Sequence, residues 1–112
     1  MFSLSSTHQF VLYKSPCDMR KSFDSLCGLV HNELNLVAHS GSVYVFINRK
    51  RNQMKLLHWE YGGFVLYHKR LEQGTFALPL TDKTQITWSD LVLMIEGIQI
   101  IKSNRKRRFN LK

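Results

Sequence analysis

Three consecutive cations, Arg49, Lys50 and Arg51, stand between two apolar runs at residues 43–47 and 53–59. Both runs are rich in β-forming residues, so the pattern predicts a β-hairpin with the cations at its tip. Like charges packed this closely repel one another and add nothing to a core, which favours contact with a polyanion. A solvated turn is the plain alternative, and the local sequence does not decide between the two.

Phosphate neutralisation is the chemistry that such cations perform best, provided that they can approach a nucleic-acid backbone. Other cations lie close by in the sequence, on the expected neighbouring strand and helix, and in the C-terminal tail. The candidate DNA-binding residues are therefore Arg49, Lys50, Arg51, Lys55, Lys69, Arg70, Arg20, Lys21, Arg105, Lys106, Arg107 and Arg108. Trp59, Tyr61 and Tyr67 are candidates for stacking on unpaired bases, although aromatic residues in strands more often belong to the core.

Catalytic chemistry finds little support in the chain. Asp18 and Asp24 lie six residues apart on the expected helix, about 240° around its axis, and cannot chelate one ion. His58 and His68, on neighbouring strands, could face each other across the sheet and, with Glu60, form a general base or half a metal site. No third ligand has suitable spacing, and there is no nucleophile elbow, glycine-rich phosphate loop or zinc knuckle. We therefore predict no catalytic residue, no metal and no cofactor.

The net charge of +8 is distributed unevenly along the chain. Of 16 lysines and arginines, six fall in residues 102–112, which contain no acid, so the remainder carries ten cations against eight acids, a net of +2. This distribution favours two local basic features over a uniformly basic surface. We expect one domain over residues 1–101, since 44% hydrophobic content suffices for a core, and a basic tail over 102–112 that is disordered on its own.

Residues 9–13 predict a short strand, and a helix-start signal follows it. Ser15 can cap free amides, Pro16 suits the first helical position and Asp18 places an acid in the first turn. Apolar residues then recur every three or four positions, at Met19, Phe23, Leu26, Val30 and Leu34. This spacing predicts a helix with one apolar face, ended by His39–Ser42.

Residues 43–78 predict an antiparallel meander. The run at 43–47 is apolar on both faces, as a central covered strand would be, and 53–59 is its return strand. A turn at 61–63 precedes a third strand over 64–71, and a second turn at 72–74 follows it. Thr87 and Asp90 then resemble a capping box before a short apolar helix. The expected fold is α+β: a single small domain with an antiparallel β-meander packed against two helices.

Compartment and redox state follow from what the sequence lacks. No apolar run approaches the roughly 18–20 residues that cross a bilayer, and the N-terminus does not resemble a signal peptide, so we expect a cytoplasmic protein without a membrane partner. Cys17 and Cys27 have the spacing of neither a redox pair nor a zinc site, and we interpret them as reduced structural thiols.

Four segments, taken together, resemble one known family. Residues 17–26 (Cys-Asp-Met-Arg-Lys-Ser-Phe-Asp-Ser-Leu) and 41–59 (beginning Gly-Ser-Val-Tyr-Val-Phe-Ile-Asn-Arg-Lys-Arg) are similar to the small accessory protein, TnpB type, of the insertion sequence sixty-six family. Residues 63–76 and 91–98 resemble that family's next strand and turn and its closing helix. The four motifs occur in the family's order and span about residues 10–100.

The resemblance implies a bacterial mobile-element protein, encoded beside a larger transposase and needed for efficient transposition, with no catalytic activity established for the family. We expect a noncatalytic accessory protein of the bacterial cytoplasm that assists transposition by binding DNA, at element ends or nonspecifically, through the basic hairpin. The alternative is a protein-interaction module whose hairpin docks on an acidic face of the element's transposase. The sequence leaves the oligomeric state and the DNA specificity open.

Overall fold

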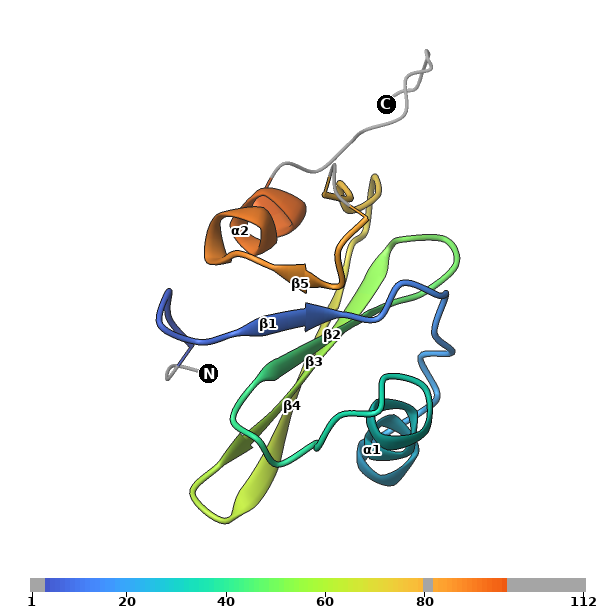
Figure 1. The fold of residues 1–112 in the computed structure, drawn as a ribbon. Helices are drawn as coiled ribbons and strands as arrows, with labels where there is room; N and C mark the ends of the chain where they lie inside the picture. Colours follow the sequence, from blue (N-terminus) through green and yellow to red (C-terminus); the bar gives the residue numbers. More distant parts are fainter. Residues whose placement is uncertain (1–3, 80–81, 97–112) are drawn as a thin grey trace.

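A five-stranded sheet lies between two helices in the computed structural model, which describes residues 4–79 and 82–96 (Figure 1). The order of strands across the sheet is β4-β3-β2-β1-β5. The elements are β1 (Phe10–Leu12), α1 (Phe23–Asn32), β2 (Val43–Ile47), β3 (Gln53–Glu60), β4 (Gly63–Arg70), β5 (Gln85–Ile86) and α2 (Trp88–Glu96). The predicted α+β class is confirmed.

The predicted meander is formed by β2, β3 and β4. β2 pairs antiparallel with β3, with Ile47 opposite Met54, and β3 pairs antiparallel with β4, with Gln53 opposite Arg70. All five residues of β2 are buried, which confirms the expected central strand covered on both faces.

The remaining strands make the sheet mixed. β1 pairs parallel with β2, which is possible because α1 provides the crossover that parallel neighbours need. β5 then pairs antiparallel with β1 at the sheet edge. The sequence pattern predicted the strand at β1 but neither its parallel pairing nor the two-residue β5.

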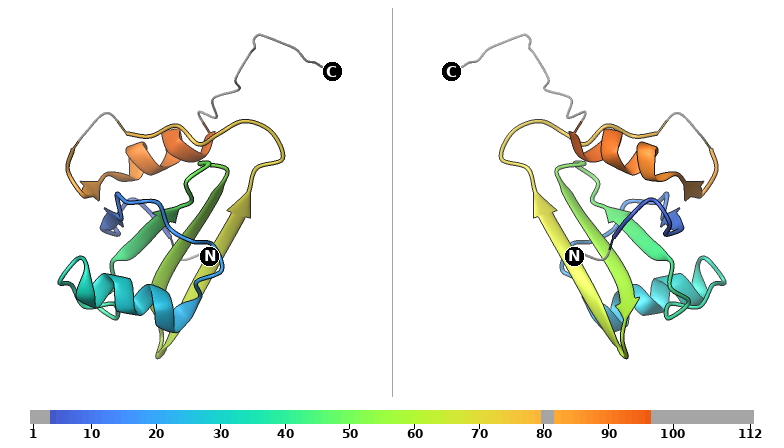
Figure 2. Two further views of the ribbon diagram at one scale, coloured as in Figure 1. Left: turned by 90° about the vertical axis from the view of Figure 1, so that its right-hand side faces the viewer. Right: turned by 90° about the vertical axis from the view of Figure 1, so that its left-hand side faces the viewer.

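Each face of the sheet has its own apolar core, because neighbouring strand residues point to opposite faces. Val43, Val45 and Ile47 pack towards α2, together with Leu91 and Met94 of that helix. Tyr44 and Phe46 pack towards α1, against Leu26 and Val30. The two helices therefore cover opposite faces, as the side views show (Figure 2).

The start of α1 differs from the prediction. The Ser15–Asp18 signal does not begin a helix, and α1 starts at Phe23 after Ser22. The backbone before it is held by the sheet instead, since the Cys17 amide donates to the Ile47 carbonyl (2.9 Å). The Asp18 carboxylate accepts a bond from the Arg20 amide (2.9 Å), so this acid stabilises a turn rather than a helix.

The end of α1 also comes earlier than expected, at Asn32 rather than near His39. Asn35 has a left-handed backbone (φ 55°), a conformation that asparagine tolerates and a helix does not continue through. Tyr44 Oη donates to the Val37 carbonyl (2.9 Å), which holds the following segment against the sheet. Leu26 and Val30 of the predicted stripe are buried, whereas Phe23 is exposed.

Helix α2 begins with the predicted capping box. The Thr87 amide donates to Asp90 Oδ2, and the Asp90 amide donates to Thr87 Oγ1, both over 3.0 Å. These reciprocal bonds satisfy amides that the first helical turn cannot pair internally.

Thr87→Ala should lower the free energy of unfolding by about 1 kcal/mol, because it removes the hydroxyl acceptor and leaves the Asp90 amide without its partner. Urea unfolding followed by circular dichroism measures the effect, with Ser89→Ala, an exposed change in the same helical turn, as the control. Equal midpoints for the two variants would show that the box does not stabilise α2.

Candidate nucleic-acid interface

The tip of the β2–β3 hairpin, residues 48–52, is fixed by the side chain of Asn48. Asn48 Oδ1 accepts bonds from the amides of Asn52 and Gln53 (3.0 Å each), and Asn48 Nδ2 donates to Asn52 Oδ1 (2.7 Å). The Arg51 amide also donates to the Asn48 carbonyl (3.0 Å). The tip is therefore an ordered turn that presents Arg49 and Lys50, both exposed, in a defined position.

Arg51 occupies a backbone conformation that glycine would adopt more easily. Its φ is 58°, in the left-handed region where a residue with Cβ costs roughly 1–2 kcal/mol. Nothing in the turn itself needs an arginine side chain at this position. Its side chain is partly exposed and lines a concavity beside the tip, where its fork of donors is accessible.

The end of β4 lies beside the tip and braces it. Arg70 is opposite Gln53 and Lys69 is opposite Met54. The amides of Leu71 and Phe76 donate to the carbonyls of Asn52 (2.7 Å) and Arg51 (2.8 Å). Arg70 Nε contacts Glu72 Oε2 at 3.2 Å, and both side chains are largely exposed, so solvent screens this pair.

The segment between β1 and α1 brings further cations to the same end of the sheet. Arg20 is exposed but paired: its Nη2 lies 2.6 Å from Asp18 Oδ2. Hydrogen bonds from the Arg20 side chain hold the pKa of the Asp18 carboxyl well below its usual range, so this acid stays ionised and offsets part of the Arg20 charge.

Lys55 does not lie on the tip surface. It is 7% exposed, and its Nζ donates to the carbonyls of Met19 (2.8 Å) and Lys21 (2.7 Å). A buried ammonium is tolerated because these acceptors replace part of its water shell. Lys55 therefore fastens the β1–α1 segment to β3 and is unavailable to a phosphate.

We call the basic end the region that combines the hairpin tip, the end of β4 and the segment after β1. Its exposed or partly exposed cations are Lys14, Arg20, Lys21, Arg49, Lys50, Arg51, Lys69 and Arg70. The opposite end of the sheet, which holds Ser42, the turn at 61–62 and the start of β1, carries no lysine or arginine within the described part of the chain. Of the predicted tail residues, Arg105, Lys106, Arg107 and Arg108 lie outside the described residues.

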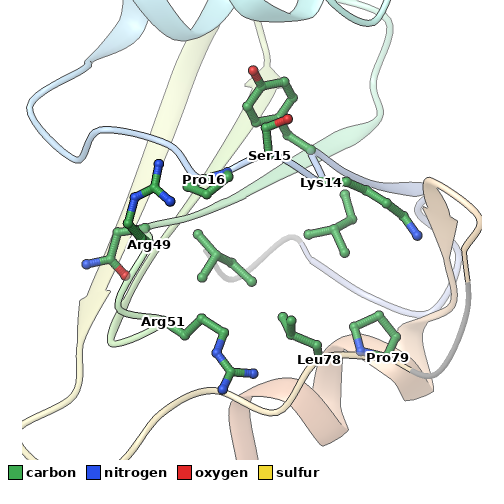
Figure 3. A pocket seen from close by; sticks show the side chains of 11 residues that line it. Lys14, Ser15, Pro16, Arg49, Arg51, Leu78 and Pro79 are labelled. Atoms are coloured by element: carbon green, nitrogen blue, oxygen red, sulfur yellow. The ribbon is translucent and has the colours of Figure 1, made fainter.

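Two concavities flank the tip and share Arg49. One is polar and open, between Asp18 and Arg20 on one side and Lys50 and Asn52 on the other. The second has a volume of about 240 Å³, an apolar floor of Leu12 and Ile47, and Leu78 and Pro79 along one side (Figure 3). Sequence reasoning did not include Lys14, which enters this second wall only because β1 lies beside β2.

Of the three aromatic candidates for base stacking, Trp59 and Tyr61 are remote from the tip, and Tyr67, opposite Leu56 in the middle of the sheet, packs against the core on the α2 side. Trp59 packs edge-to-face on Phe64 (4.9 Å between centroids), and Tyr61 is fully exposed in the turn at the other end. Trp59 lies seven positions along β3 from Asn52, roughly 23 Å of strand, and Tyr61 lies beyond the end of β3. Stacking by these residues therefore cannot belong to the same contact as the basic end.

The two histidines of the enzyme hypothesis do not face each other. His58 is opposite Val65 and points towards the α2 side, whereas His68 is opposite Lys55 on the α1 side. His58 Nδ1 lies 3.0 Å from Glu60 Oε2, which also accepts a bond from Tyr67 Oη (3.2 Å). His58 is 4% exposed, so this is a satisfied internal network without room for a substrate.

Other chemistry is equally unsupported within residues 4–79 and 82–96. No three His, Cys, Asp or Glu side chains gather there as metal ligands. Cys17 and Cys27 are free thiols, and burial raises the pKa of both. None of the helices described is long and apolar enough to cross a membrane.

Comparison with known proteins gives one family and one relative. The family model described as IS66 Orf2 like protein matches residues 8–105. The uncharacterized protein y4jC of Sinorhizobium fredii (strain NBRC 101917 / NGR234) is 26% identical over 93 residues, which cover 81% of this chain and 80% of the relative. No solved structure matches the chain. The family match includes the tip, the whole sheet and both helices.

Lys55→Met should lower the free energy of unfolding by about 1–3 kcal/mol, because the carbonyls of Met19 and Lys21 lose their charged donor. It should also speed hydrogen exchange of the Arg20 and Lys21 amides, since the segment is no longer held to β3. The control is Met54→Leu, a volume-conserving change at the adjacent buried position. Unchanged stability together with unchanged exchange would contradict the role given to Lys55.

Proposed function

The chain belongs to the IS66 Orf2-like family, and we propose that it serves as an accessory protein of DNA transposition by binding duplex DNA through its basic end. Members of this family are accessory proteins of insertion sequences and are generally considered noncatalytic. The proposal concerns how this chain carries out such a role. The element's transposase is the protein partner that we expect it to serve.

The main support for this proposal is that three separate segments bring cations to the basic end. Arg49, Lys50 and Arg51 come from the hairpin, Lys69 and Arg70 from β4, and Lys14 and Arg20 from the segment after β1. Bringing like charges together costs free energy in the absence of a counter-charge. A polyanion with closely spaced phosphates offsets that cost and releases its own counterions on binding.

The hairpin tip suits a duplex because it is ordered before contact. The Asn48 network fixes the turn, so little side-chain and backbone entropy is lost from the loop on binding. A two-stranded ribbon has the dimensions to enter a major groove. The cations available at the tip make phosphate contacts, which set position and affinity rather than base sequence.

The predicted residues contribute unequally to the proposed surface. Lys55 is excluded from the DNA-binding surface because it is buried. The contribution of Arg20 to phosphate binding is reduced by its ion pair with Asp18. Lys21 is only partly exposed beside the Lys55 anchor. Arg105, Lys106, Arg107 and Arg108 remain part of the proposal as additional phosphate contacts.

Removing the tip charges should weaken duplex binding in a salt-dependent manner. For the intact chain we expect log affinity to fall with log salt concentration with a slope of about −4 or steeper. Combining Arg49→Ala, Lys50→Ala and Arg51→Gly should make the slope less steep by about 2–3, because three phosphate contacts are lost. Glycine at position 51 suits the left-handed backbone there and protects the turn.

The matched control lowers the net charge equally but away from the basic end. Gln9→Glu, Asn32→Asp and Asn35→Asp conserve side-chain shape at three exposed positions and also remove three units of charge. This control should keep nearly the full salt slope. The DNA proposal fails if the intact chain does not bind duplex at low salt, or if both triple variants lose affinity to the same extent.

A further inference from the structure

The second concavity beside the tip, which we call the apolar pocket, has a composition that phosphate binding alone does not explain. Its lining includes the apolar side chains of Leu12 and Ile47. Leu78 and Pro79 line one side (Figure 3). Leu78 is 45% exposed, so this wall of the pocket is accessible from solvent. A duplex backbone presents phosphates and deoxyribose rings, and it has no bulky apolar side group to insert between these residues.

Two guanidinium groups border this apolar surface. Arg49 and Arg51 approach it from the hairpin, while Leu78 and Pro79 belong to the segment after β4 (Figure 3). Guanidinium groups bind carboxylates through paired, charge-assisted hydrogen bonds. An apolar floor with a guanidinium border therefore complements a ligand that has an apolar centre and carboxylates on its flanks.

The size of the pocket limits what can enter it. A cavity of about 150 Å³ accepts a benzene molecule, so about 240 Å³ is enough to receive one bulky side chain or one base. The choice between these two depends on the polar atoms of the walls.

A nucleobase fits the pocket poorly, because its edge carries several hydrogen-bonding groups that must be satisfied when buried. The Asn48 amide, the best neutral partner nearby, is already used by Asn52 and Gln53. The aromatic ring in the lining, Tyr13, already packs on Phe46 (5.7 Å between centroids), and the walls named above are aliphatic, whereas unpaired bases are usually held by stacking on aromatic rings. An aliphatic or aromatic side chain of a peptide needs neither a hydrogen-bonding partner nor an aromatic ring to stack on.

We infer that the apolar pocket is a docking site for an acidic peptide segment of another protein, which inserts one bulky apolar side chain between Leu78 and the hairpin tip. Carboxylates next to the inserted residue pair with Arg49 and Arg51. This inference does not rest on DNA binding, although the two ligands share these arginines. It gives the chain a second contact, through which it can be joined to a protein partner.

Three labelled probes test this site on the full chain. They are an acidic twelve-residue peptide with a central Leu-Phe pair, the same peptide with two serines in place of that pair, and a single-stranded oligonucleotide of twelve thymidines. The Leu-Phe peptide should bind about tenfold or more tightly than the serine peptide, as expected for burying one large apolar side chain. It should also shift the methyl NMR signals of Leu12, Ile47 and Leu78.

Variants separate this site from the DNA surface. Leu78→Ser should lower the affinity for the Leu-Phe peptide at least about fivefold, because it removes an apolar wall, and should change duplex affinity less than about twofold. Lys50→Ala, outside the apolar pocket, should weaken duplex binding more than peptide binding.

The inference is overturned if the Leu-Phe and serine peptides bind equally, or if only the oligonucleotide shifts the three methyl signals, which would make the occupant a base. If the intact chain binds the Leu-Phe peptide but does not bind duplex DNA at low salt, the proposed function is overturned and the docking site stands.

Discussion

The ammonium group of Lys55 is the contact on which the arrangement of the basic end depends. It sits under the sheet on the α1 side and ties the carbonyls of Met19 and Lys21 to β3. It acts together with the bonds that the Tyr13 and Cys17 amides donate to the carbonyls of Val45 and Ile47, which hold the earlier part of the same segment against β2. With it, Arg20 and the polar concavity are held next to the tip. The buried ammonium of Lys55 thus helps to hold the exposed guanidinium group of Arg20 beside the hairpin tip.

The alternation of strand residues gives lysines two different roles within a short distance. Lys55 points to the covered α1 face of β3, while Arg49 and Lys50 extend beyond the paired strands into solvent. Arg51 differs from both the buried Lys55 and the exposed tip cations, because its backbone is left-handed, a conformation that a residue with a Cβ atom tolerates but does not favour. Its side chain lines the apolar pocket beside the tip, where it is accessible to a ligand.

Local signals in the sequence predicted those parts of the fold that local interactions control. The hairpin follows from two β-rich runs around a polar turn, and the α2 start follows from the spacing of Thr87 and Asp90. The start of α1 could not be predicted in this way, because hydrogen bonds to Ile47 and Lys55, distant in sequence, override a good helix signal. The parallel pairing of β1 and the short β5 likewise depend on contacts that no local pattern contains.

One feature of the sequence indicates that Lys55 is buried. It stands between Met54 and Leu56 in a strand that is apolar on both faces, and a cation in such a run has to find acceptors inside the protein. Which acceptors these are could not be deduced, since they are backbone carbonyls of an irregular segment. The apolar pocket could not be deduced from the sequence either, because its walls come from three segments that only the folded chain brings together.

The central claim is that DNA meets the chain at the basic end, and NMR mapping with a short duplex tests it most directly. On titration of the isotope-labelled full chain at low salt, we expect amide signals of residues 48–52 and 69–72 to shift most, with the turn at 61–62 unaffected. Shifts centred on the 61–62 turn or on the outer face of α2, with the hairpin tip unchanged, would contradict it.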